Sequence, residues 1–100
     1  LTKLIRKKVK FDAIFAMNDT LAMGCYQAAK EQNLEIAKDF SIIGFDNSLT
    51  AINLRPTLSS IQLPIAEMTA KSIQHIFDDK NYDENYKVYV ECKLVERNSI

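Results

Sequence analysis

The chain has 100 residues, of which 47% are apolar and 26% are charged, and its formal net charge at pH 7 is zero. This composition is ordinary for one globular domain or for a piece of one. Because 13 Lys and Arg residues balance 13 Asp and Glu residues, no overall positive field draws the segment to DNA phosphates or to an anionic membrane. We therefore expect this segment by itself to bind neither.

The cysteines and the ends of the chain exclude several further classes of protein. Cys25 and Cys92 have no CxxC spacing, and only one histidine accompanies them, so we expect no zinc site, no disulfide framework and a reducing, intracellular setting. No apolar run approaches the roughly 20 residues that span a bilayer. The chain starts at Leu1 without a signal-peptide pattern or an initiator Met, so we expect upstream sequence to have been cut away.

The first half of the chain predicts a strand, a helix and a second strand. The short apolar run at residues 11–17 indicates a strand of a covered sheet. Helical spacing at residues 20–32 follows, with Asn18 or Asp19 as the N-cap and Asn33 as the stop. A β-branched pair before a turn cluster then indicates a strand at residues 40–45.

The helix expected at residues 20–32 has a broad apolar surface. Its predicted sheet-facing arc comprises Leu21, Cys25, Ala28 and Ala29. Met23 and Tyr26 extend the apolar surface beyond this arc. Packing under a neighbouring loop and contact within an oligomer both explain the extra width, and the pattern does not choose between them.

The second half predicts a loop through residues 47–56, a third strand at 57–62, and a helix at 64–77 that Pro64 opens. Strand-like segments follow at residues 86–90 and 93–96. Strands that alternate with helices favour an α/β fold whose largely parallel sheet is flanked by helices.

Three polar clusters fall where the predicted strands end, at Asn18 with Asp19, at Asp46 with Asn47, and at Gln62. Parallel strands bring such clusters to one edge, where open α/β sheets bind ligands. Amide and carboxylate groups without a nucleophile suit the holding of hydroxyls, as in sugars. Helix capping by Asn18 and an Asx-type turn at Asp46 remain alternative explanations.

Catalysis and cofactor binding lack support in the sequence. His75 has polar neighbours at helical spacing, and we expect it to face solvent rather than to join a triad. Glycine occurs only at positions 24 and 44, so no phosphate-cradling loop is present. We expect no enzymatic activity, no catalytic residue, no cofactor and no metal site.

Several motifs together resemble a known family. The run FDAIFAMNDTLAMGCYQAAKEQNLEIAKDFSIIGFDNS, then LRPTLSSIQLPIAEM and finally LVERNS, is similar to the C-terminal part of LacI/GalR-type transcriptional repressors. The resemblance covers about residues 11–99. It implies a periplasmic-binding-protein-like (type I) effector domain of two α/β subdomains, with a small effector, often a sugar or a purine, in the cleft between them. Asn18 and Asp46 fall where such repressors place effector-contacting side chains.

The resemblance also implies a division of the chain and a dimer. Residues 1–62 would belong to the C-terminal effector subdomain, residues 63–92 to a crossover helix and strand of the other subdomain, and residues 93–100 to the return. Met23 and Tyr26, together with the loop that ends at Leu54, would contribute to a homodimer interface. Asn33 and Ala37 stand where the family usually has Gly and Pro, which changes the turn before the second strand without altering the expected fold.

The implied protein is an effector-binding, dimeric, cytoplasmic regulator, with operator DNA bound only through a helix-turn-helix domain absent from this chain. Two alternatives are a periplasmic sugar-binding protein of the same fold and a regulator whose co-effector is a phosphoprotein. The residues that precede Leu1 would distinguish the first alternative, and a comparison of protein capture with a sugar panel would distinguish the second.

Overall fold

The structure of the protein is a computed structural model, which describes residues 1–77 and 87–100. Its elements follow in the order α1 (Thr2–Arg6), β1 (Ala13–Phe15), α2 (Asp19–Glu31), β2 (Ser41–Phe45), α3 (Leu49–Asn53), β3 (Ser59–Gln62), α4 (Ile65–Phe77) and β4 (Lys93–Val95). The alternation of strands and helices confirms the predicted α/β class.

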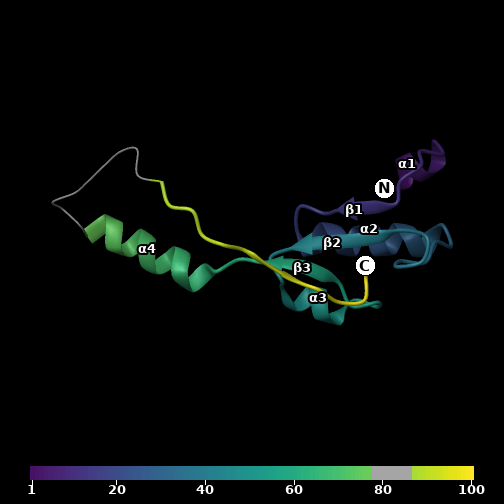
Figure 1. Ribbon diagram of the computed structural model, residues 1–100. Coiled ribbons are helices and arrows are strands. Elements are labelled where there is room, and N and C mark those ends of the chain that lie inside the picture. The colour runs from purple at the N-terminus through teal and green to yellow at the C-terminus, as the bar shows by residue number, and fades with distance from the viewer. Residues whose placement is uncertain (78–86) are drawn as a thin grey trace.

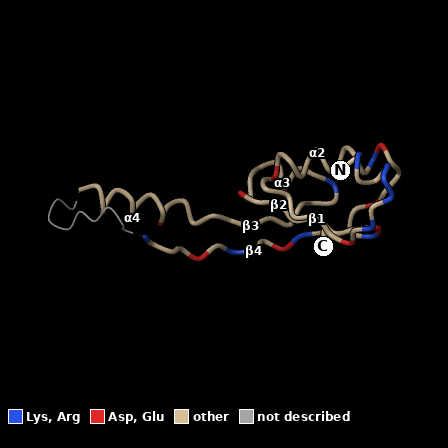
Figure 2. Tube along the Cα trace, turned by 90° about the horizontal axis from the view of Figure 1, so that it is seen from above, with Lys and Arg blue, Asp and Glu red and all other residues tan. Residues whose placement is uncertain are grey.

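The four strands form one sheet in the order β1-β2-β3-β4. The first two pairs are parallel, with Ile14 beside Ile42 and Gly44 beside Ser60, whereas β4 runs antiparallel to β3. Helices α2 and α3 lie on the same side of the sheet (Figures 1 and 2). The sheet was expected to be covered by flanking helices. This expectation is met only in part, because the Phe15 side chain of β1 is 64% exposed.

The core lies between the sheet and the helices α2 and α3. Its members are Ala16, Ala22, Tyr26, Ala29, Phe40, Ile42, Ala51 and Leu58. The predicted sheet-facing arc of α2 is wrong at Leu21, which is 55% exposed. The buried stripe instead runs from Asp19 through Ala22 and Tyr26 to Ala29, because a carboxylate at the start of the helix is buried by hydrogen bonds rather than by apolar packing.

Both predicted ends of α2 are confirmed. The Asn18 side chain accepts a hydrogen bond from the Leu21 amide at 2.8 Å, which satisfies one of the unpaired donors of the first turn. After the helix ends, Asn33 has a φ of 55°, the left-handed conformation that asparagine tolerates better than most residues.

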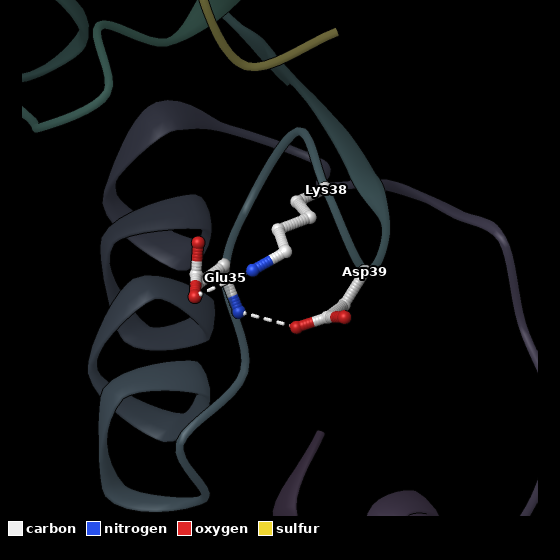
Figure 3. A network of polar contacts seen from close by, with 3 residues as sticks. All are labelled: Glu35, Lys38 and Asp39. Carbon is white, nitrogen blue, oxygen red and sulfur yellow. Dashed lines mark hydrogen bonds and ion pairs between the residues drawn. The ribbon is translucent and has the colours of Figure 1, made fainter.

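The turn between α2 and β2 is held by local polar contacts, which Figure 3 shows from close by. The Asp39 carboxylate accepts a hydrogen bond from the Glu35 amide at 2.7 Å, and the Lys38 ammonium lies 2.9 Å from the Glu35 carboxylate. Ala37 between them has a φ of 68°. These contacts maintain the turn although Ala37 lacks the conformational freedom of glycine.

Helix α4 extends away from the sheet, so that the molecule measures 59 × 26 × 16 Å (Figure 1). No residue of α4 is buried, and its apolar stripe is exposed at Ile65, Met68, Ile73, Ile76 and Phe77. His75 on this helix is half-buried rather than solvent-facing as expected, and it lines one pocket together with Val88 and Val90 of the returning segment.

Three segments differ from the sequence expectation in their secondary structure. Residues 2–6, for which no element was predicted, form α1. Residues 49–53, predicted as loop, form α3, while residues 87–90 of the strand predicted at 86–90 have no regular structure. Tyr86 lies outside the described residues. The strands expected at 40–45, 57–62 and 93–96 and the helix expected at 64–77 are confirmed with slightly shorter bounds. The strand expected at 11–17 is confirmed only over Ala13–Phe15.

Candidate functional site

The turn that follows β2 has an unusual backbone. Asp46 has a φ of 100° and Asn47 a φ of 49°, conformations in which side chains other than glycine are disfavoured. The Asp46 amide donates to the Ile61 carbonyl of β3 at 2.9 Å, and the Asn47 amide donates to the Ser60 hydroxyl at 3.0 Å. The turn is therefore fastened to the neighbouring parallel strand, and the Asp46 side chain is left exposed.

A buried carboxylate lies directly beneath this turn. Asp19, the first residue of α2, is only 1% exposed. One of its oxygens accepts hydrogen bonds from the Ser48 amide at 2.7 Å and from the Ser48 hydroxyl at 2.8 Å, while the other accepts from the Ser60 hydroxyl at 2.6 Å. These three donors offset the cost of burying the carboxylate and join α2, the start of α3 and β3.

The exposed side of the turn lines a pocket of about 520 Å³. Asp46, Asn47 and Gln62 lie along it, and Glu67 of α4 and the linking residues between β3 and α4 complete it. The parallel arrangement thus brings Asp46 and Gln62 together. Asn18 is not among the lining residues, and its side-chain oxygen is engaged in capping α2.

The charge of this pocket bears on what it can hold. Its described lining residues include the carboxylates of Asp46 and Glu67 and no Lys or Arg. The Lys and Arg residues of the segment 3–10 lie at the end of the sheet that is remote from α4 (Figure 2). Lys93 of β4 is paired with Gln62 and lines the neighbouring pocket. Within the ranges 1–77 and 87–100, no group of three or more His, Cys, Asp or Glu side chains is placed to hold a metal ion. The carboxylate and amide oxygens of this wall can accept hydrogen bonds from hydroxyl groups.

A second hollow, of about 680 Å³, contains the residues expected at a dimer contact. Met23, Tyr26 and Leu54 all line it. The Tyr26 hydroxyl donates to the Pro56 carbonyl at 2.9 Å, so Tyr26 packs under the neighbouring loop, whereas Met23 remains 48% exposed. Burial raises the pKa of Tyr26 to about 12, and the phenol therefore stays a neutral donor at ordinary pH.

Comparison with known proteins identifies this architecture. The family described as the periplasmic binding protein-like domain matches residues 2–100. The ribose operon repressor of Haemophilus influenzae is 37% identical over 102 residues, which cover the whole of this chain and 31% of that protein. The chain belongs to this family, in its LacI-type branch.

Solved structures of LacI-type regulators have the same fold. A sugar-binding transcriptional regulator from Escherichia coli, complexed with phosphate, superposes with a TM-score of 0.83 at 31% identity, over 97% of this chain and 35% of that one. A regulator from Enterococcus faecium with bound ribose gives a TM-score of 0.77 at 28% identity, over 98% of this chain and 38% of that one. The chain therefore spans about a third of the length of the LacI-type proteins that it matches.

Among the described residues, no helix is long and apolar enough to cross a membrane. The LacI-type relatives named above are transcriptional regulators or repressors by description.

Sequence reasoning missed the polar residues that support the turn. The sequence indicates no partner for Asn47 or Ser48, yet Asn47 accepts a hydrogen bond from Arg97, 50 positions further on, and Ser48 donates to Asp19. Ser60 and Arg97 were not singled out. The available signal was the cluster of small hydroxyl residues in LSS, since a serine in the middle of a covered strand requires a polar partner.

Proposed function

We propose that this chain is the effector-binding and dimerisation segment of a cytoplasmic, non-enzymatic LacI-type transcriptional repressor, and that its effector is a small uncharged sugar. The observation that carries this proposal is the pocket along which Asp46, Gln62 and Glu67 lie, with carboxylate and amide groups that can hold hydroxyls. Operator DNA would be bound through a helix-turn-helix domain outside this chain. The names of the relatives support a regulator rather than an enzyme.

We further propose that the pocket is one wall of a cleft between two subdomains. Residues 1–62 and 93–100 would belong to one subdomain, and residues 63–92 would belong to the other. The distance of α4 from the sheet supports this division (Figure 1). Asn18, which follows β1, would contact the ligand at the same end of the sheet as Asp46 and Gln62. Closure of the cleft would change DNA affinity only if the effector binds one arrangement more tightly than the other.

Titration of the full-length regulator with D-ribose tests the effector site. We expect Asp46→Ala to weaken D-ribose binding about tenfold to a hundredfold, because a hydrogen bond to a charged group contributes about 1.5–3 kcal/mol. The free energy of unfolding should fall by no more than about 1 kcal/mol, since the Asp46 side chain is exposed and the only cost is that alanine tolerates a φ of 100° less well than aspartate. Isothermal titration calorimetry measures the affinity, and chemical denaturation measures the stability.

Ribose 5-phosphate serves as the comparison ligand in the same titration. The acidic wall should disfavour a phosphate dianion, so the wild-type protein should bind the phosphorylated sugar less tightly than the neutral one. Preferred binding of the phosphate ester would contradict the uncharged-sugar proposal, and a D-ribose affinity that survives Asp46→Ala unchanged would remove Asp46 from the site.

The dimer contact is tested by a charge placed in the second hollow. We expect Met23→Glu to shift the full-length protein from dimer to monomer, because removing a carboxylate from water at an interface is costly even though Lys30 and Arg55 line the same hollow. The matched control is Leu21→Glu on the same helix, since Leu21 is also exposed but does not line that hollow. Sedimentation velocity distinguishes the two states. A Met23→Glu protein that sediments as the wild-type dimer would exclude this surface.

A further inference from the structure

Arg97 makes the longest-range contact to the Asp46 turn. Its Nη2 donates to the Asn47 side-chain oxygen at 2.6 Å, and its Nη1 donates to the Leu58 carbonyl at 2.7 Å. The guanidinium is planar and carries its donors in a fixed fork, so two bonds in different directions fix its position. Arg97 is partly buried, which reduces the competition of water for both bonds.

The turn needs such support because its backbone is strained. Two consecutive residues, Asp46 and Asn47, have positive φ, and each such residue costs on the order of 1–3 kcal/mol unless its surroundings maintain it. The amides of the turn are already bound to β3 and to Asp19. The Asn47 side chain is the remaining point at which the turn is held, and Arg97 holds it.

Arg97 is itself placed by the strand that returns from α4. It follows β4, which pairs with β3, and its amide donates to the Ser59 hydroxyl at 2.8 Å. The anchor of the turn therefore comes from the end of the segment that connects the two parts of the molecule (Figure 1).

We propose that Arg97 is a positioning residue for the effector site. Through Asn47 it holds the Asp46 turn in the strained conformation that presents the Asp46 carboxylate to the pocket. This inference rests on the proposed function of that pocket. Arg97 does not line the pocket, so its effect on ligand binding is exerted through the turn.

Amide hydrogen exchange in the full-length protein tests the anchor without any ligand. Arg97→Lys keeps the charge but loses the fork, and Asn47→Ala removes the acceptor. Both variants should exchange the amides of Asp46 and Asn47 about tenfold faster than wild type, because local opening then costs less. Asn47→Asp retains an oxygen for Arg97 and should keep the wild-type rate. The Leu34 amide, bound to Ala29 in the end of α2, serves as an internal reference.

Arg55→Lys is the matched control for replacing a guanidinium, which has several N–H donors in fixed directions, by an ammonium group. Arg55 is exposed and donates to the carbonyls of Ile52 and Leu54, away from the turn, so its replacement should leave exchange at Asp46 unchanged. Where D-ribose binds the wild type, Arg97→Lys should also weaken that binding about tenfold, whereas Arg55→Lys should leave it unchanged.

Different measurements contradict the role of Arg97 and the proposed effector site. Wild-type exchange at Asp46 and Asn47 in both Arg97→Lys and Asn47→Ala would show that Arg97 does not hold the turn. Faster exchange in both variants, together with a D-ribose affinity that Asp46→Ala leaves unchanged, would retain Arg97 as the anchor of the turn but overturn its role in effector binding.

Discussion

Gly44→Ala is expected to lower the free energy of unfolding by about 3 kcal/mol or more, because the added methyl group would overpack the core and disturb a hydrogen-bonded carboxylate. A Cβ at position 44 would overlap the Asp19 carboxylate and lie 2.8 Å from the Leu58 side chain. Neither neighbour has room to move, since Asp19 is held by three donors and Leu58 is fully buried. Gly44 is thus required by close approach and not by its backbone conformation, which has no positive φ.

Gly24→Ala provides the matched control for this substitution. Gly24 lies inside α2, and a Cβ there would meet nothing within 4 Å. Alanine is favoured over glycine in a helix by about 0.5–1 kcal/mol, so this variant should be slightly more stable than wild type. Urea denaturation of both variants measures the difference. Equal midpoints for Gly44→Ala and wild type would contradict the packing described between β2 and α2.

The general architecture could be predicted from sequence because apolar periodicity reports on local structure. The short apolar runs and the amphipathic stretches identified β1, α2, β2, β3 and α4. Helix α3 escaped prediction because five residues contain little more than one turn and no periodic pattern. The antiparallel direction of β4 was also not predictable, since it depends on where the chain returns and not on the residues of the strand.

The orientation of α2 was mispredicted only at its start, at Leu21, for an electrostatic reason, whereas Ala28 and Ala29 are buried as predicted. A helical wheel assigns charged residues to solvent and apolar residues to the core. Here Asp19 is buried because three donors meet it, and this rotates the buried stripe away from Leu21. Such a partner set is assembled from residues about 30 and 40 positions away, so no local pattern contains it.

The candidate site was likewise predictable where it depends on local pattern and not where it depends on residues distant in sequence. Asp46 and Gln62 could be placed at one edge because parallel strands end together. The hydrogen bonds that support the turn could not be predicted. Ser60 contacts Asp19, and Arg97 contacts Asn47, only in the folded chain.

The largest polar effect is expected at Asp19. Asp19→Ala should lower the free energy of unfolding by about 3–5 kcal/mol, because it removes the acceptor of three hydrogen bonds in a region without solvent access. Asp39→Ala is the control, since Asp39 is exposed and accepts one bond from the Glu35 amide (Figure 3). We expect that control to cost about 1 kcal/mol or less. Chemical denaturation measures both, and comparable losses would contradict the buried role of Asp19.

Asp19→Asn separates the charge from the shape of this side chain. Its amide oxygen must take the position that accepts from the Ser48 amide, because a backbone N–H cannot reverse its direction. The amide nitrogen then faces the Ser60 hydroxyl, which already accepts from the Asn47 amide and loses its own acceptor. We expect a cost of about 1–2 kcal/mol, smaller than that of Asp19→Ala. Because Ser48 and Ser60 both support the turn, Asp19→Asn should also speed amide exchange at Asn47. A loss of stability without faster exchange there would show that the buried carboxylate stabilises the fold independently of the turn that presents Asp46.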